Sequence, residues 1–453
     1  MTAPVRIPFP VVDEVSRHCL QEQEPETVHI EVHLPGPLEP ARLRKAFTEA
    51  LHRHPRILMR EAGGPWFRRR YEWELTTEPD TEVVTFTPAG PRALQDARTR
   101  ALAEAPPLTM SPPIRLEAVA ALAAGNRAAG AARVGAAAPR PAELRTHPAP
   151  APSPSTTQGT VLLLTINHTA LDGPACLRIL ATAAELYGGQ DNNPTAPPTR
   201  AAEPGKEPPD TPTTWSPPAR VAQGTPDPSP GNGMLVTELP LPHRPKGSPY
   251  TVNDQLMVTT ALTIAHWNRE HGARPRPLRI TMPVDDRPRD TTMPIGNGTR
   301  LVEVPFSPGE LKAEMSTLLR RTAERTRALK SQPRPQLGHG AALLTSPWAP
   351  VAARAALTRG LRRAAAPWTS TTLLSNIGRI PYPLDFGEEA GRAHAVWFSA
   401  PARMPRGLTV TTASTAGRLH LALRWSRSLL SHGDGAHLRD LFEHYLHTTE
   451  VAP

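Results

Sequence analysis

His168 and Asp172 are the residues whose types and spacing could do chemistry. The histidine follows an apolar run at 161–166 with one residue between, and the aspartate comes four residues later, directly before Gly173. An imidazole, which titrates at about pH 6.5, can act as a general base at neutral pH. The pattern indicates that His168 takes a proton from a substrate, although a histidine that only ends a strand has the same local sequence.

The elements around this histidine can be predicted from the same stretch. The run 161–166 has the length and the β-branched ends of a strand that is buried on both faces. The glycine and proline at 173–174 predict a tight turn, and 174–188 has the apolar stripe of a helix. Strand ends are places where a rigid scaffold presents a side chain to a cleft. We therefore expect His168 in a cleft at the edge of a sheet.

Two further residues of this stretch have an expected role. Gly173 can adopt positive φ, which would let backbone N–H groups approach a substrate and stabilise an oxyanion. Cys176 lies on the apolar stripe of the helix that follows. Buried cysteines of this kind pack as small apolar side chains, so we expect Cys176 in the core rather than as a nucleophile.

Strands and helices alternate irregularly along the rest of the chain. Helices are predicted at 37–54, 93–104, 251–270 and 436–446, and another begins at the capping pattern Ser307-Pro308-Gly309-Glu310. Strands are predicted at 28–34, 66–75, 82–86, 114–122, 234–241, 278–284, 300–305, 369–375, 394–399, 407–413 and 418–425. Because there is no strict βαβ repeat, the pattern predicts an α/β or mixed α+β fold with mixed sheets.

Two stretches of low complexity divide the chain. Residues 123–158 are nearly all alanine, proline, glycine, arginine and serine, and 189–233 are rich in proline, threonine and aspartate. Such compositions bury too little apolar surface to offset the entropy of ordering. We therefore predict a disordered insertion at 123–158 and a disordered linker at 189–233. They separate an N-terminal lobe, 1–188, from a C-terminal lobe, 234–453.

The composition argues against several classes of protein. The chain has 2 cysteines in 453 residues, without metal-binding spacing, so we expect no metal site and a reducing, cytoplasmic setting. No apolar run approaches the ~18 residues of a membrane span, and the N-terminus does not resemble a secretion signal. The net charge of +9 comes from scattered arginines without a nucleic-acid motif. We expect neither membrane nor nucleic acid as partners, whereas a basic surface could attract an acidic protein.

The order of these features resembles the superfamily of condensation domains and acyltransferases that includes chloramphenicol acetyltransferase. Its His-His-x-x-x-Asp-Gly motif is matched by 167–173, with asparagine in place of the first histidine. Residues 52–55 are similar to the end of the family's first helix, and 252–254 are similar to the start of its second-lobe helix. Residues 282–288, together with 296–297, are similar to the segment that carries a structural arginine and asparagine. Residues 375–378 and 385–387 resemble late motifs, although Glu388 and Glu389 replace a tryptophan-glycine pair.

This resemblance implies a fold and a set of roles. The molecule would have two similar lobes in a V, with a tunnel between them and a crossing segment near 385–399. His168 would be the catalytic base in the tunnel. Asp172 would point away from substrate and form a buried bidentate pair with Arg287 of the second lobe, which would hold the loop. Asn167 would hold the loop by hydrogen bonds or contact substrate, while Ser375 and Asn376 would donate hydrogen bonds to the intermediate or form a turn.

The activity that the resemblance implies is acyl transfer to an amine or a hydroxyl, as in nonribosomal peptide synthesis or other specialised metabolism. The co-substrate would be a thioester, either acyl-CoA or an acyl group on the phosphopantetheine of an acyl or peptidyl carrier protein, and no resident cofactor is expected. The acceptor would be a small molecule. Two alternatives stay open: a degenerate member that only binds or docks, because of Asn167, and a cyclase or isomerase that uses the same tunnel.

Overall fold

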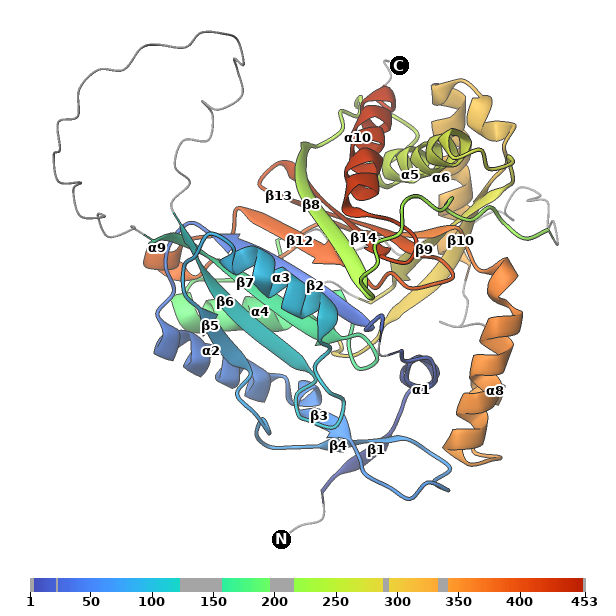
Figure 1. Cartoon of the computed structure of the whole chain (residues 1–453). Coiled ribbons are helices and arrows are strands. Elements are labelled where there is room, and N and C mark those ends of the chain that lie inside the picture. The colour runs from blue at the N-terminus through green and yellow to red at the C-terminus, as the bar shows by residue number, and fades with distance from the viewer. Residues whose placement is uncertain are drawn as a thin grey trace, which may run out of the picture.

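The computed structural model describes residues 4–21, 23–122, 157–195, 216–287, 293–332 and 341–450. Within these ranges the strands form three sheets, with helices packed on them, in a mixed α/β arrangement (Figure 1). The insertion predicted at 123–158 lies outside the described residues except for its last two. Those two residues begin a long strand, β7 (Thr157–Asn167), so the insertion ends earlier than predicted.

The first large sheet has five strands and contains the strand that leads to His168. Its order is β12 (Ala395–Ser399), β2 (Thr27–Leu34), β7, β6 (Ile114–Leu122) and β5 (Val84–Thr87). All neighbours are antiparallel except β5 and β6. A separate three-stranded sheet has the order β1 (Arg6–Pro8), β4 (Glu72–Leu75) and β3 (Met59–Glu61). Only the end of the strand predicted at 66–75 therefore forms.

Helices cover both faces of the five-stranded sheet, which confirms that β7 is buried on both sides. Leu162 and Leu164 belong to the core under α2 (Pro40–Arg53) and α4 (Gly173–Gly188). Val161 and Leu163 belong to a smaller cluster under α3 (Ala93–Ala103). Because successive side chains of a strand point to opposite faces, such a position favours a run in which nearly every residue is apolar.

The second large sheet has six strands and a mixed topology. Its order is β10 (Thr299–Phe306), β9 (Leu278–Asp285), β11 (Thr372–Arg379), β13 (Leu408–Thr415), β14 (Arg418–Ser426) and β8 (Asn232–Pro240). β11 runs parallel to both of its neighbours, and the other pairs are antiparallel. The second core lies between this sheet and three helices, α5 (Val252–Glu270), α6 (Met315–Ser331) and α10 (His432–Thr448).

β12 ties the two halves of the chain together. It comes from the C-terminal half but pairs with β2 of the first sheet, as the colours of Figure 1 show. Trp397 of β12 also donates its Nε1–H to the carbonyl of Thr237 in β8, at 3.0 Å. The crossing expected near 385–399 is therefore present, and it holds the loop after β12 between the sheets. The remaining helices are α1 (Val11–His18), α7 (Ala341–Thr345), α8 (Val351–Ala364) and α9 (Gly387–Ala390).

The helix predicted to begin at Ser307 is interrupted. The Ser307 Oγ accepts the expected hydrogen bond from the Glu310 backbone N at 3.1 Å, but only a short 3-10 turn, Glu310–Lys312, follows. The chain is extended at Ala313, and α6 begins at Met315. The restart places Leu318 and Leu319 in the second core, so tertiary packing decides where the long helix begins.

The predicted linker is also ordered at its two described ends. Asn192 donates a hydrogen bond to the Asp385 carbonyl at 3.0 Å. Ala219 and Val221 are buried in the second core. The interpretation of 189–233 as disordered is wrong for these residues, because their few apolar side chains pack on elements that are distant in sequence.

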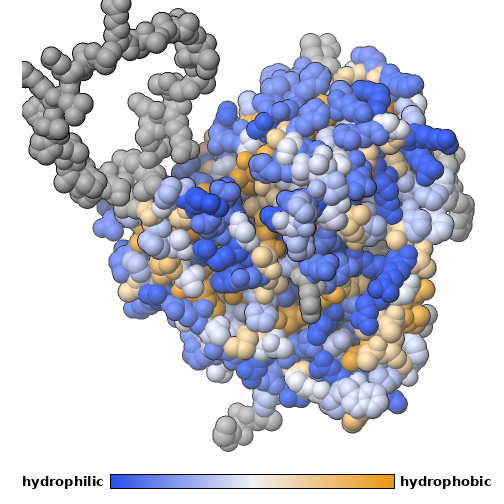
Figure 2. All heavy atoms as spheres, viewed as in Figure 1, coloured by the Kyte–Doolittle hydropathy of each residue, from blue (hydrophilic) through white to orange (hydrophobic). Residues whose placement is uncertain are grey.

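Hydrophilic residues cover most of the face shown in Figure 2, with smaller hydrophobic areas between them.

Candidate functional site

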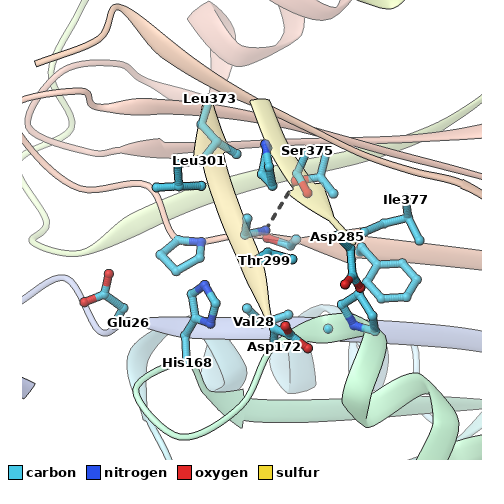
Figure 3. A pocket seen from close by; sticks show the side chains of 18 of the residues that line it. Glu26, Val28, His168, Asp172, Asp285, Thr299, Leu301, Leu373, Ser375 and Ile377 are labelled. Atoms are coloured by element: carbon cyan, nitrogen blue, oxygen red, sulfur yellow. Dashed lines mark hydrogen bonds between the residues drawn. The ribbon is translucent and has the colours of Figure 1, made fainter. Parts of the chain in front are cut away.

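A cavity of about 450 Å³ lies between the two large sheets and contains His168. The histidine enters from the loop after β7, and Leu373 and Ser375 come from β11 on the opposite side (Figure 3). Phe398 of β12 also lines the cavity. Much of the lining is apolar, including Val15, Val28, Leu177, Met293, Leu301 and Ile377. The predicted position of His168, at a strand end and facing a cleft, is confirmed.

The backbone and one ring nitrogen of His168 are both anchored. The backbone N–H donates to the Glu26 carbonyl at 2.8 Å. Nδ1 lies 3.0 Å from the Leu171 carbonyl. A carbonyl oxygen can only accept, so Nδ1 carries the proton in this hydrogen bond. In the neutral ring the lone pair is therefore on Nε2, the atom that a general base needs.

Asn297 holds the loop of His168 from the second half of the chain. Its Nδ2 lies 3.2 Å from the His168 carbonyl, 3.0 Å from the Thr169 carbonyl and 2.9 Å from Oδ1 of Asp13. Asp13 is buried, and its other oxygen accepts from Trp73 Nε1 at 2.9 Å. Burial raises the pKa of Asp13 to about 6, although these two hydrogen bonds partly oppose the effect. The resemblance pointed to Asn297 as structural, whereas no sequence pattern indicates Asp13.

Asp172 is buried and makes three contacts that fix the turn after His168. Its Oδ1 accepts from the Ala175 backbone N at 3.1 Å and so caps α4. Its Oδ2 accepts from Arg287 Nη2 at 2.7 Å and from the Gly298 backbone N at 2.9 Å. The expected pair between Asp172 and Arg287 is present, and it joins the first lobe to the end of β9.

The geometry of that pair differs from the bidentate one expected. Arg287 makes a single bond to Asp172 and binds Asp285 with two, Nε to Oδ1 and Nη2 to Oδ2, both at 2.9 Å. It also donates to the Pro294 and Gly296 carbonyls at 3.2 and 3.0 Å. Burial by itself lowers the pKa of Arg287, but Asp285 and Asp172 raise it above its ordinary value. Asp285, two residues away, occupies the Nε–Nη2 edge of the guanidinium.

Asn167 does not face the cavity. Its Nδ2 donates to the Pro106 carbonyl at 2.9 Å, and its Oδ1 accepts from the Thr169 backbone N at 3.1 Å. The side chain is buried and is absent from the lining described above. The prediction that Asn167 contacts substrate is therefore wrong, and the alternative, that it holds the loop, agrees with these contacts.

Gly173 allows a close contact with β12 and does not have the positive φ that we predicted. It lies in the first turn of α4, and its φ is not positive. A Cβ at this position would stand 3.2 Å from two ring carbons of Phe398, which also lines the cavity. The absent side chain thus lets β12 pack closely against the start of α4. Cys176, three residues on, is fully buried in the first core, as predicted, and burial raises the pKa of its thiol.

Ser375 and Asn376 both line the cavity, which confirms that the structure brings them to the site of His168. A β-bulge between Asn376 and Gly378 re-aims the end of β11. The Asn376 Oδ1 accepts from the Gly378 backbone N at 2.9 Å, and its Nδ2 donates to Asn253 Oδ1 at 3.2 Å. Asn376 is thus committed to the turn, and Ser375 is the better donor to a bound substrate.

Several residues of the site carry no signal in the sequence. Glu26, Arg403 and Arg406 line the cavity from loops, and Asp285 completes the Arg287 pair. They reach the site because of the crossing of β12 and the pairing of β9. No motif or spacing marks Glu26, Arg403 or Arg406, and the segment 282–288, which contains Asp285, pointed only to its arginine. In the part of the chain that the structure describes, no group of three or more histidine, cysteine, aspartate or glutamate side chains could hold a metal ion. Nor is any of its helices long and apolar enough to cross a membrane.

Sequence comparison gives distant relatives of unassigned function. No protein-family model matches the chain. Uncharacterized protein Rv2305 of Mycobacterium tuberculosis is 26% identical over 411 residues, which cover 83% of this chain and 84% of that protein. The same values hold for uncharacterized protein MT2362 of another strain of this organism.

Comparison of structures identifies the fold. Trichothecene 15-O-acetyltransferase TRI3 from Fusarium sporotrichioides matches with a TM-score of 0.61 at 12% identity, over 99% of this chain and 96% of that one. The condensation domain of monacolin K polyketide synthase MokA matches with 0.59 at 11% identity, over 99% and 98%. The chain has the condensation-domain fold. A mutant starter condensation domain of rhizomide synthetase RzmA, solved with C8-CoA, matches with 0.58 at 14% identity, over 94% and 90%.

Proposed function

We propose that the protein is an acyltransferase that moves an acyl group from a thioester to an amine or hydroxyl, with His168 as the general base. The observation that carries this proposal is the anchored ring of His168 in a cavity shared by both lobes. Its Nδ1–H is held by the Leu171 carbonyl at 3.0 Å, which leaves the Nε2 lone pair for a substrate proton. The fold, which is shared with an O-acetyltransferase and with condensation domains, supports the same class of reaction.

The proposed reaction balances without a further reactant. The nitrogen or oxygen of the acceptor attacks the thioester carbonyl carbon while His168 Nε2 takes its proton. The tetrahedral intermediate then collapses, the carbon–sulfur bond breaks, and the proton on His168 passes to the leaving sulfur. The products are an amide or ester and a free thiol, and the histidine returns to its starting form.

The intermediate would carry a negative oxygen that needs a hydrogen-bond donor. Ser375 has a hydroxyl on the wall of the cavity that faces the histidine loop (Figure 3). We assign it the role of donor to this oxygen. The apolar part of the lining fits an acyl chain, because burying methylene groups against it releases about 0.8 kcal/mol each.

The donor in this proposal is acyl-CoA or an acyl group on a carrier protein. Its RzmA structural neighbour was solved with C8-CoA, which supports a thioester of that kind. The formal net charge of +9 would attract an acidic carrier protein through long-range electrostatics. The thioester would be a co-substrate that arrives and leaves, so the proposal requires no resident cofactor.

The test is product formation by the purified full-length protein. Acyl-CoA and acyl-pantetheine donors are offered with a panel of amines and alcohols, and products are identified by mass spectrometry. His168→Ala should lower the rate about 10²- to 10⁴-fold, the usual contribution of a general base, with a nearly unchanged melting temperature. The control is His444→Ala, which removes an exposed histidine of α10.

Two outcomes would count against the proposal. Full activity in His168→Ala would remove the histidine from the chemistry. Binding of octanoyl-CoA without product from any acceptor would favour a protein that only binds thioesters.

A further inference from the structure

Three arginines line one part of the cavity that contains His168. Arg403 and Arg406 come from the loop between β12 and β13, and Arg362 comes from α8. The proposed chemistry uses none of them. Glu26 is the acid that lines the same part of the cavity. Its backbone carbonyl accepts the hydrogen bond from the backbone N–H of His168 at 2.8 Å. Of the three, Arg403 is connected to the histidine loop through Glu26.

Arg403 is neutralised by the protein itself. Its Nη1 lies 2.5 Å from Oε2 of Glu26 and 2.9 Å from the Cys19 carbonyl. Glu24, the other acid close by, accepts a hydrogen bond from the Met404 backbone N at 2.9 Å. Arg403 therefore already occupies the carboxylate of Glu26, whereas Glu24 does not line the cavity and forms no ion pair with any of the described residues.

Arg406 has only neutral partners within hydrogen-bond distance. Its Nε lies 3.1 Å from Ser370 Oγ, and its Nη2 lies 3.4 Å from Thr281 Oγ1. Within the described ranges no carboxylate comes close enough for an ion pair with Arg406, and Glu303 and Glu26 act on it only at longer range. Burial, together with Arg403 and Arg362, lowers its pKa to about 10, so it stays charged at neutral pH.

A charged group in such a place is costly without a counter-ion. Removing an ion from water is unfavourable, and the cost is repaid only by a paired charge with good hydrogen bonds. The guanidinium has donors in a planar fork that matches a carboxylate. The local balance of three arginines against Glu26 leaves room for an anion from outside the protein.

We propose that Arg406, with Arg362 beside it, binds a carboxylate of the acyl donor or of the acceptor. The inference rests on the proposed function, because it takes the cavity to be the substrate site. The substrate would then be an acyl group with a distal carboxylate or an acceptor that is itself an acid, such as an amino acid. The phosphates of CoA are a poorer fit, because the long pantetheine arm keeps them away from the thioester that must reach His168.

The test measures binding rather than turnover, so it does not depend on the chemistry. Octanoate and its neutral analogue octanamide are titrated into the full-length protein at pH 8 by isothermal calorimetry. We expect octanoate to bind at least tenfold more tightly than octanamide. Arg406→Met should reduce this preference about 10- to 100-fold, as expected for hydrogen bonds to a charged group. The control is Arg363→Met, which changes an exposed arginine next to Arg362 in α8. It should leave the preference for octanoate unchanged.

Stability separates this role from a structural one. If Arg406 awaits an anion, Arg406→Met removes an uncompensated charge and should leave the melting temperature equal or higher. A structural arginine would lower it. If Arg406→Met does not fold, Arg362→Met provides the second measurement, and it should weaken the octanoate preference severalfold.

Each remaining outcome decides one question. Equal binding of octanoate and octanamide by the wild type, or an unchanged preference in Arg406→Met, would overturn the subsite. If free CoA binds Arg406→Met tenfold more weakly while octanoate shows no preference, the occupant is a phosphate and the carboxylate assignment is wrong. Octanoate preference without any acyl transfer would refute the proposed function and retain the subsite, and acyl transfer without the preference would do the reverse.

Discussion

The buried contact between Asp172 and Arg287 gives a prediction whose size can be worked out from the structure. Asp172→Ala removes one hydrogen bond from Arg287 at 2.7 Å, one from the Gly298 backbone N at 2.9 Å and the cap of α4 at 3.1 Å. Breaking a buried ion pair costs about 3–5 kcal/mol, mostly because one charge is left without a partner. Here Arg287 keeps both bonds to Asp285, so no charge is left unpaired.

The loss for Asp172→Ala should therefore lie at the lower end of that range, about 3 kcal/mol in the free energy of unfolding. Arg287→Met should cost more, about 4–5 kcal/mol, because it leaves Asp172 and Asp285 buried without a cation. Asp172→Asn keeps a cap acceptor and should cost the least of the three. If the charges determine the loss in unfolding free energy, this loss is largest for Arg287→Met, smaller for Asp172→Ala and smallest for Asp172→Asn. Ordinary packing predicts no such order.

The measurement is urea unfolding followed by circular dichroism, combined with the acyl-transfer rate. The control is Asp440→Ala, whose carboxylate is 59% exposed beside Arg439, and it should cost less than about 1 kcal/mol. Asp172→Ala should also lower the rate about 10²-fold, because the loop that carries the Leu171 carbonyl then loses its support. A loss of stability below about 1 kcal/mol for Asp172→Ala, or a smaller loss for Arg287→Met than for Asp172→Ala, would refute the reasoning.

Two further predictions concern the loop and its supports. Because the pKa of Asp13 is raised from 3.8 to about 6 in the folded state, that state binds the proton more tightly. Asp13 should therefore lower stability by about 3 kcal/mol as pH rises from about 4 to 6, and a wild-type stability curve parallel to that of Asp13→Asn would contradict this. Asn167→Asp should cost about 2–3 kcal/mol in urea unfolding, since a carboxylate would face the Pro106 carbonyl, and equal stability would show that the amide donor is dispensable.

Short-range signals were enough to predict much of the scaffold. The apolar run of β7, with Thr165 as its one polar residue between 161 and 166, follows from burial on both faces, whereas the alternation of β2 misleads, because His29 and Glu31 are buried as well. The capping box at Thr251 and Asp254 is formed as its spacing indicates, with the Thr251 backbone N donating to Asp254 Oδ2 at 2.8 Å. These elements are predictable because the residues that decide them are neighbours in the chain.

Helix α1 shows where such signals end. Its buried residues are Asp13, Glu14 and His18, so it lacks the apolar stripe that identifies a helix. Glu14 is paired with the fully buried Arg354 of α8, and Asp13 with Asn297 and Trp73. Partners 60 to 340 residues away make this polar face tolerable inside the protein, and local patterns contain no information about them.

The sequence by itself determined that His168 ends a strand, that Asp172 lies in the following turn and that the two belong to one loop. Only the tertiary structure decided what surrounds them. The crossing of β12 brings Arg403 and Arg406 to the cavity, the pairing of β11 with β9 and β13 places Ser375 and Asn376 in its lining, and Asp285 takes the bidentate place on Arg287 that Asp172 was expected to hold. The physical reason is that strand order and register, which join distant segments, set the direction of these side chains, whereas the motif is set by residues a few positions apart.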